Sequence, residues 1–294
     1  MKQKERIQFI VNPFSGTGQK KKLPELIQTH LDHNRFEYTY TLTERAQHGV
    51  TLAKEAVEAG FDIVCAVGGD GSVNEVASSL VGTQTALAVI PAGSGNGFAG
   101  HLSLSRNPVE AIQTLNKSQA KLIDTCSANE HFFLNVAGIG FDALVAYKTK
   151  KNKRRGLSPY IMTAIKESAA FQPMHLSFEV DGKHIEGNYV AAVVANAMYY
   201  GYGFSISPLS SISDGIMDLI LIKETQKWRY FMESYRFLTK TLHESKFVDT
   251  YRGRDIRIKI DKEEHFHVDG EGYPLDKDLH CKIHPKSLKV MRYP

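Results

Sequence analysis

The sequence has 294 residues, a formal net charge of +4 and 42% hydrophobic residues. This length suits two globular domains, and the hydrophobic content is that of a soluble protein. The charge is too mild to indicate a nucleic-acid partner. No apolar run approaches the ~18 residues that span a membrane, and the start, MKQKERIQFIVN, is unlike a signal peptide. We therefore expect a cytoplasmic protein that touches membranes only from their surface.

The cysteines predict no disulfide and no metal centre. Cys65, Cys126 and Cys281 are far apart in apolar or strand-like stretches, and neither CxxC nor HExxH spacing occurs. We expect reduced thiols in or near the core, as in a reducing compartment.

Residues 1–125 alternate strand and helix patterns, which is typical of a parallel α/β sheet. The expected strands are Ile7–Val11, Phe36–Leu42, Ile63–Val67 and Ala86–Ile90. Helical patterns cover Lys20–Leu31 and Val50–Glu58, and another follows the third strand.

The pattern changes after about Asp124, and residues 126–284 predict an antiparallel β-sandwich domain with helices. The expected strands are His131–Ala137, Leu176–Val180, Tyr189–Asn196, Met217–Ile222, Ile256–Ile260 and Phe266–Val268. Asp-Gly pairs at 181, 214 and 269 mark turns, and Pro159–Phe171 and Gln226–His243 are helical patterns. The C-terminal segment 285–294 could return to the first domain.

The segment Val64–Leu80, VCAVGGDGSVNEVASSL, runs from an apolar strand through a glycine loop into a helix. Glycines let a phosphate approach the backbone amides, and a helix start adds free N–H groups and a favourable dipole. A lone carboxylate repels phosphate, so Asp70 fits here if it holds Mg²⁺ or a water on Mg²⁺. The alternative is a tight turn with Asp70 exposed.

Two further glycine-rich loops also follow strands. Asn12–Gly18, NPFSGTG, lacks the Lys-Ser/Thr end of a Walker A loop and the GxGxxG spacing of a Rossmann turn. Pro91–Gly97, PAGSGNG, offers Ser94 and Asn96 as donors to a phosphate or ribose. Because ligands sit beyond the carboxyl ends of parallel strands, all three loops could face one nucleotide. A plain loop and a flexible connection are the alternatives.

The ordered set of motifs resembles the diacylglycerol kinase catalytic-domain family. The set is NP-x-SG, a threonine at 43, GGDGS-x-NEV, PAGSGN, GIGFDA, SDGIMDL and VDGEG. The family includes bacterial lipid kinases, ceramide kinases and sphingosine kinases. GGDG alone is also similar to NAD kinases and phosphofructokinases, and the resemblance implies that fold for the first domain.

The resemblance implies roles for individual residues. Glu271 would be the catalytic base that takes the proton from a lipid hydroxyl, and Asp70 would act beside it through Mg²⁺. From the residues alone, an exposed residue of a hairpin turn is the preferred interpretation of Glu271. The implied ATP site consists of Asn12, Pro13, Phe14, Ser15, Gly16, Thr43, Gly68, Gly69, Asp70, Gly71, Ser72, Val73, Asn74 and Ser94.

The resemblance also implies a second Mg²⁺, away from the chemistry. Its ligands would be the carboxylate of Asp214 and the main-chain carbonyls of Ser211 and Ile216, because hard cations prefer oxygen. A metal-free Asp-Gly turn is the alternative.

Two positions depart from the commonest family pattern. GGDGS replaces GGDGT, and PAGSGNG replaces the Thr-x-Asn-Asp form, so Gly97 stands where many diacylglycerol kinases have an acid. We expect an ATP- and Mg²⁺-dependent kinase of a lipid alcohol, with diacylglycerol as the first choice. The alternatives are a sphingoid-base or ceramide kinase, a soluble-metabolite kinase such as NAD kinase, and a nucleotide-binding sensor without turnover.

The basic run Lys148–Arg155, KTKKNKRR, suits an anionic membrane surface or a solvated loop. The expected partners are a lipid substrate and the inner face of the membrane, where the protein would be peripheral. A homodimer stays open.

Overall fold

The structure is a computed structural model that describes residues 3–15, 22–151, 156–168, 170–261, 263–276 and 278–292. The chain divides into two compact units. Unit 1 comprises residues 1–123 and 286–294, and unit 2 comprises residues 124–285. The chain therefore passes from unit 1 to unit 2 and back again.

Unit 1 is built on a parallel sheet in the order β2-β1-β3-β4. The end of β17 (Leu279–Arg292) runs parallel to β4, with Val290 opposite Leu87. The predicted parallel α/β architecture is confirmed. The strands are β1 (Glu5–Val11), β2 (Phe36–Leu42), β3 (Ile63–Gly68) and β4 (Ala86–Pro91). The helices are α1 (Leu23–His30), α2 (His48–Glu58), α3 (Asp70–Leu80), α4 (Gly97–His101) and α5 (Pro108–Lys117).

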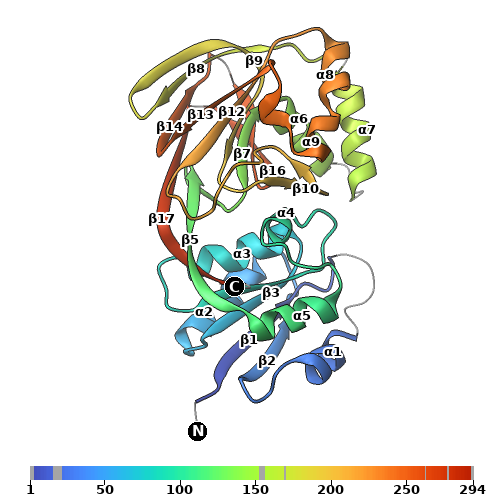
Figure 1. The fold of residues 1–294 in the computed structure, drawn as a ribbon, viewed down its shortest axis with the longest axis vertical. Coiled ribbons are helices and arrows are strands. Elements are labelled where there is room, and N and C mark those ends of the chain that lie inside the picture. The colour runs from blue at the N-terminus through green and yellow to red at the C-terminus, as the bar shows by residue number, and fades with distance from the viewer. Residues whose placement is uncertain are drawn as a thin grey trace. The chain divides into compact units, whose positions relative to one another are not determined.

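Helices cover both faces of this sheet, with α1 and α5 on one side and α2 and α3 on the other (Figure 1). Every residue of β3 and β4 is therefore buried. Alternate strand residues such as Phe9 and Cys65 pack against Ile27 of α1 and Ile112 of α5. Continuous apolar runs of this kind are what a strand buried on both faces requires.

Helix α5 is absent from the expectations above, although its start carries strong local signals. Asn107 is the N-cap, and its side-chain oxygen accepts a hydrogen bond from the N–H of Val109 at 3.0 Å. Pro108 occupies the first turn, where its missing N–H costs nothing.

Unit 2 is an antiparallel β structure, as predicted. Its main path is β16-β15-β7-β9-β8-β14-β17, and β12 joins β9 to β13. The longer strands are β5 (Gln119–Ala128), β7 (Val136–Gly140), β8 (Met174–Val180), β9 (Lys183–Ala195), β12 (Met217–Lys223), β13 (Val248–Gly253), β14 (Asp255–Lys259), β15 (Glu264–Val268) and β16 (Glu271–Leu275). The shorter strands are β6 (His131–Phe133), β10 (Tyr199–Gly201) and β11 (Phe204–Ser205).

The helices of unit 2 are α6 (Phe141–Lys151), α7 (Leu157–Ser168), α8 (Lys227–Glu233) and α9 (Tyr235–Thr239). The single helix expected over Gln226–His243 is wrong. The segment breaks after Glu233, and Lys240, in the left-handed region with φ +60°, ends α9. A 3₁₀ turn at Leu242–Glu244 follows. Of the basic run, residues 152–155 lie outside the described residues.

All three cysteines are buried and unpaired. Burial raises the pKa of the Cys65 and Cys126 thiols well above the usual value and that of Cys281 to about 12. These groups therefore stay protonated and inert, as expected of core thiols. No helix among the described residues combines the length and apolar character needed to cross a bilayer.

Two of the predicted Asp-Gly turns join antiparallel strands. Asp181–Gly182 connects β8 to β9, and Asp269–Gly270 connects β15 to β16. Both residues of each pair have positive φ, which a two-residue type I′ hairpin requires. The third pair, at Asp214, instead precedes β12.

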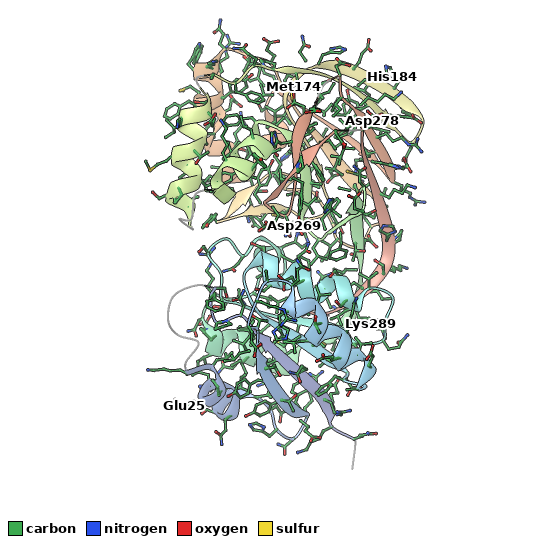
Figure 2. The ribbon with its side chains drawn as sticks, turned by 180° about the vertical axis from the view of Figure 1, so that it is seen from behind. Glu25, Met174, His184, Asp269, Asp278 and Lys289 are labelled. Atoms are coloured by element: carbon green, nitrogen blue, oxygen red, sulfur yellow. The ribbon has the colours of Figure 1, made fainter. Side chains whose placement is uncertain are left out.

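Asp269 (labelled in Figure 2) also fixes the start of β7. Its carboxylate accepts hydrogen bonds from the N–H groups of Leu134, Asn135 and Val136 at 2.9–3.0 Å. Asp269→Ala would leave three buried donors unpaired, so we expect it to lower the free energy of unfolding by roughly 3–5 kcal/mol. Chemical denaturation of the variant measures this loss.

Asp181→Ala is the matched control. Asp181 also accepts N–H groups from a neighbouring segment, those of Arg254 and Asp255, but these bonds are exposed. Water can replace them, so the expected cost is only about 1 kcal/mol. Equal losses in the two variants would contradict the role assigned to Asp269.

Candidate active site

The four parallel strands of unit 1 bring their carboxyl ends to one edge of the sheet, where the loops that follow them meet. Most of the predicted nucleotide-binding residues lie on these loops, and Gly16 lies outside the described residues. Asn12, Pro13, Phe14 and Ser15 follow β1, Thr43 follows β2, and Ser94 follows β4. Gly68 ends β3, Gly69 joins it to α3, and Asp70, Gly71, Ser72, Val73 and Asn74 form the start of α3.

Asn12 links the first loop to the GGDGS loop. Its Nδ2 donates to Ser72 Oγ at 2.9 Å, and its Oδ1 accepts from the N–H of Phe14 at 2.9 Å. Gly68 makes room for this contact, because a Cβ there would lie 2.5 Å from Ser72 Oγ. The serine that replaces the commoner threonine is thus held between two loops.

The GGDGS and PAGSGNG loops touch through bare backbone. A Cβ built on Gly93 would lie 2.3 Å from the Cα of Gly69, a distance at which no side chain fits. A Cβ on Gly71 would meet nothing within 4 Å. The same glycine loop is therefore closed on one side and open on the other, as a loop that receives a phosphate must be.

Asn96 is turned inward rather than toward a ligand. It is buried, with φ +53°, and its amide accepts from the N–H of Gly93 at 3.0 Å and donates to the carbonyl of Gly93 at 2.9 Å. The amide oxygen and one amide N–H of Asn96 are therefore used within the loop, and donation to a phosphate or ribose stays a prediction. Ser94, in contrast, is exposed.

Asp70 begins α3 and is half buried. Its Oδ1 accepts from the N–H of Phe98, on α4, at 3.2 Å. The Asp70 carboxylate beside the open face of the loop is an oxygen donor of the kind that Mg²⁺ accepts together with phosphate oxygens.

His101, at the end of α4, is neutral at pH 7, because burial and the nearby Arg292 guanidinium lower its pKa to about 4.

Glu75, in the same motif, has a structural role that the sequence does not predict. Its carboxylate oxygens accept from the N–H groups of Gln47 and Gly49, both at 3.1 Å, at the start of α2. A negative charge at a helix start is stabilising. Glu75 thereby ties the loop after β2, which carries Thr43, to α3.

In unit 2, Glu271 is exposed at the first position of β16, opposite Val268 of β15. It follows the Asp269–Gly270 turn directly, so the three bonds that hold Asp269 also hold its backbone. An exposed carboxylate on a fixed hairpin is able to take up a proton from a substrate.

A polar trio joins α6, β10 and β15, the first strand of this hairpin. Asp142 Oδ2 contacts His267 Nε2 at 2.9 Å and accepts from the Tyr200 hydroxyl at 2.9 Å. Burial and the Asp142 carboxylate raise the pKa of Tyr200 well above its usual value. Gly138 allows the arrangement, because a Cβ there would lie 2.5 Å from Asp142 Oδ2. The sequence shows Asp142 only as part of GIGFDA, without its partners.

The Asp214 turn is held by an arginine. Arg252 of β13 pairs with Asp214 Oδ2, and Asp214 Oδ1 accepts from the N–H of Ile216 at 3.2 Å. Arg252 also bonds the buried Asp218 at 3.0 Å. Within the described residues, no group of three His, Cys, Asp or Glu side chains could hold a metal ion. A cation at Asp214 would compete with Arg252 for this carboxylate, so the predicted Mg²⁺ site stays a prediction.

Comparison with known proteins places these features in a family. Residues 6–128 match the diacylglycerol kinase catalytic domain, and residues 135–292 match the YegS C-terminal NAD kinase beta sandwich-like domain. The chain belongs to the diacylglycerol kinase catalytic-domain family. It is a lipid kinase.

Individual relatives cover nearly the whole chain. A diacylglycerol kinase of Bacillus subtilis is 28% identical over 277 residues, which are 91% of this chain and 90% of that protein. A probable lipid kinase YegS-like of Chromohalobacter salexigens is 28% identical over 86% of this chain and 84% of its own. A crystal structure of a diacylglycerol kinase from Bacillus anthracis str. Sterne shares the fold, with a TM-score of 0.77 and 22% identity over 99% of this chain and 97% of that one.

The backbone contact between Gly69 and Gly93 generates a test of how the lipid kinase holds its loops. Gly93→Ala must push the GGDGS and PAGSGNG loops apart, so we expect it to lower the free energy of unfolding by about 2–3 kcal/mol. Gly71→Ala, where a Cβ meets nothing, should leave the unfolding midpoint within error of the wild type. Thermal or denaturant unfolding checks both, and an unchanged midpoint in Gly93→Ala would contradict the close approach.

Proposed function

We propose that this lipid kinase transfers the γ-phosphate of ATP to the hydroxyl of diacylglycerol or a related neutral lipid alcohol. The observation that carries the proposal is the catalytic-domain match over residues 6–128, whose glycine loops are tied together at the carboxyl edge of one sheet. The family assignment favours this function over a soluble-metabolite kinase and over a sensor without turnover.

The nucleotide is assigned to unit 1. Backbone N–H groups of the GGDGS loop and the start of α3 would bind the phosphates, and the exposed Ser94 would add a hydroxyl. Asp70 would hold Mg²⁺, whose charge neutralises the transferring phosphoryl group. The residues implied at Asn12–Gly16 and Thr43 complete the proposed ATP site.

The base is assigned to unit 2. Glu271 would accept the proton of the lipid hydroxyl as its oxygen forms a bond to the γ-phosphorus. The bond between the γ-phosphorus and the β,γ-bridging oxygen would break, and ADP would leave with its electron pair. Asp269 would keep the hairpin in place, and the buried Asp142–His267 pair would support β15 beneath it.

A second class of lipid is also a candidate acceptor. Gly97 stands where many diacylglycerol kinases have an acid, and the GSGN form is similar to that of the sphingosine and ceramide kinases. A sphingoid base or ceramide is therefore the alternative acceptor. Phosphorylation of a total lipid extract with labelled ATP, with the products identified by mass, decides between the two acceptors.

The remaining assignments are also proposals. The protein would act in the cytoplasm at the inner face of the membrane, where its lipid resides. A Mg²⁺ held by Asp214 and the carbonyls of Ser211 and Ile216 requires Arg252 to move, so no step of the reaction is assigned to it.

Asp70→Asn removes the carboxylate beside the glycine loop. We expect turnover to fall by about 10²–10³-fold at saturating Mg²⁺ and ATP. The Mg²⁺ that would neutralise the phosphoryl charge loses its carboxylate ligand. Asp62→Asn is the control. Asp62 directly precedes β3, at the end of the strand away from Asp70, and accepts a hydrogen bond from the N–H of Arg6 at 2.8 Å. Wild-type turnover in a folded Asp70→Asn protein would remove Asp70 from the mechanism.

Glu271→Gln tests the division of labour between the units. The amide keeps the size of the side chain but cannot take the proton, so lipid phosphorylation should fall by about 10²–10⁴-fold. Affinity for a nonhydrolysable ATP analogue, measured by calorimetry, should stay within about twofold of the wild type. The reason is that Glu271 belongs to unit 2, whereas the proposed nucleotide contacts belong to unit 1.

Glu264→Gln is the matched control for this variant, at the other end of the same hairpin, opposite Leu275. It should retain turnover. Wild-type phosphorylation by Glu271→Gln would assign the base to another residue, and loss of nucleotide binding would contradict the assignment of ATP to unit 1.

A further inference from the structure

Helices α8 and α9 present large apolar side chains to solvent. We call the set the α8–α9 patch; its members are between 51% and 81% exposed and are Trp228, Phe231, Met232, Tyr235 and Leu238. Their spacing of three and four residues places them on one side of the segment. Exposed apolar sets of this size mark interaction surfaces in soluble proteins.

The opposite side of the same segment is anchored in unit 2. The Tyr230 hydroxyl accepts from the N–H of Thr225 at 2.6 Å and donates to the carbonyl of Lys223 at 3.2 Å. Phe237 packs on the buried cluster that includes Val193 and Ile220. The helices thus have a core side already filled, and the patch is a second apolar side that the fold does not use.

The segment that carries the patch is positively charged. Residues 226–246 contain five Lys or Arg and two Glu, and both Glu233 and Glu244 contact Arg236, at 2.7 and 3.5 Å. The Arg229 guanidinium lies 5.2 Å from the Trp228 ring, and Lys246 Nζ lies 5.3 Å from the Phe247 ring. The segment therefore combines aromatic rings, aliphatic side chains and a net charge of +3.

This combination identifies the occupant. Trp and Tyr are enriched at the level of lipid headgroups, and Lys and Arg beside them attract anionic lipids. In a twofold dimer of this chain, the patch would meet its own copy, and two segments of charge +3 would face each other. Charge complementarity thus favours an anionic bilayer over a second copy.

We propose that the α8–α9 patch inserts into the headgroup region of an anionic lipid bilayer and holds the kinase at the surface that contains its substrate. The inference rests on the proposed function, which sets the acceptor within a membrane. Helix α7 lies on the same side of unit 2 (Figure 1) and also exposes Ile161, Met162 and Ile165.

The test is flotation of the full chain with phosphatidylcholine vesicles, with and without phosphatidylglycerol, in the absence of ATP. Binding to the anionic vesicles should weaken about tenfold for each large side chain removed in Phe231→Asp and in the double variant Trp228→Ala/Phe231→Ala. It should also weaken with salt. Leu122→Asp, which charges a 45% exposed leucine on β5, is the control and should bind like the wild type.

Three outcomes would overturn the inference. They are unchanged vesicle binding by Phe231→Asp, equal binding of the wild type to neutral and anionic vesicles, and a wild-type dimer that Phe231→Asp makes monomeric in light scattering. Thermal unfolding verifies that the exposed substitutions leave the fold intact.

Turnover on a short-chain diacylglycerol dissolved as monomers separates this inference from the proposed function. The patch variants should phosphorylate this lipid like the wild type and lose activity only on vesicles. A wild type that binds vesicles through the patch but does not phosphorylate any lipid would refute the proposed function and leave the anchor standing.

Discussion

The active-site edge of unit 1 depends on a close approach of two backbones. Strands β3 and β4 are neighbours in a parallel sheet, so the loops after them leave the sheet side by side. Only glycines at 69 and 93 allow these loops to touch, and the amide of Asn96 then closes the second loop on Gly93. Because the two loops touch along their inner sides, Gly71 and Ser94 lie on the outer side. A rigid, bare backbone surface at a helix start is a physical requirement for binding phosphate without an ordering cost.

In unit 2 the Asp269–Gly270 turn has a comparable structural role. The Asp269 carboxylate satisfies three N–H groups at the start of β7, and the same strand leads through Gly140 into α6, which begins beside Asp142. His267, two residues before the turn, returns to Asp142. The Asp269–Gly270 hairpin thus braces both ends of β7, and Glu271 is the exposed end of a well-supported element rather than of a loose loop.

The sequence predicts the elements whose signals are local. Strand β2 has the predicted bounds, and the α/β and antiparallel halves were recognisable from apolar periodicity and Asp-Gly turns. Helix α5 is not among the predicted helices, although Asn107 and Pro108 are local signals of a helix start. The break between α8 and α9 could not be seen, because the whole segment has one helical apolar period and what interrupts it is the backbone at Ser234 and Lys240.

The candidate site was predictable in position but not in detail. Glycine loops after strands must gather at the carboxyl edge, so the placement of Asn12, Asp70 and Ser94 follows from the pattern. Which polar side chains face outward does not follow. Asn96 bonds its own loop, and Glu75 accepts N–H groups at the start of α2, 28 and 26 residues away. No local sequence signal predicts either contact. Arg252 reaches Asp214 across thirty-eight residues, a pairing that only the β12–β13 register creates.

The charge of the loops bears on how the proposed metal would be held. Asp70 is the one acidic side chain in segments 12–15, 68–74 and 91–98, since Gly97 lacks the acid of the commoner pattern. A polyphosphate entering these loops meets one carboxylate instead of two, so it is repelled less. Mg²⁺ characteristically combines one or two carboxylates with substrate phosphates and retained waters. A single carboxylate beside an open glycine loop is therefore better suited to an ion that arrives with the nucleotide than to one the protein keeps, and the serine at 72, bonded to Asn12, sets the loop's shape whether or not the ion is present.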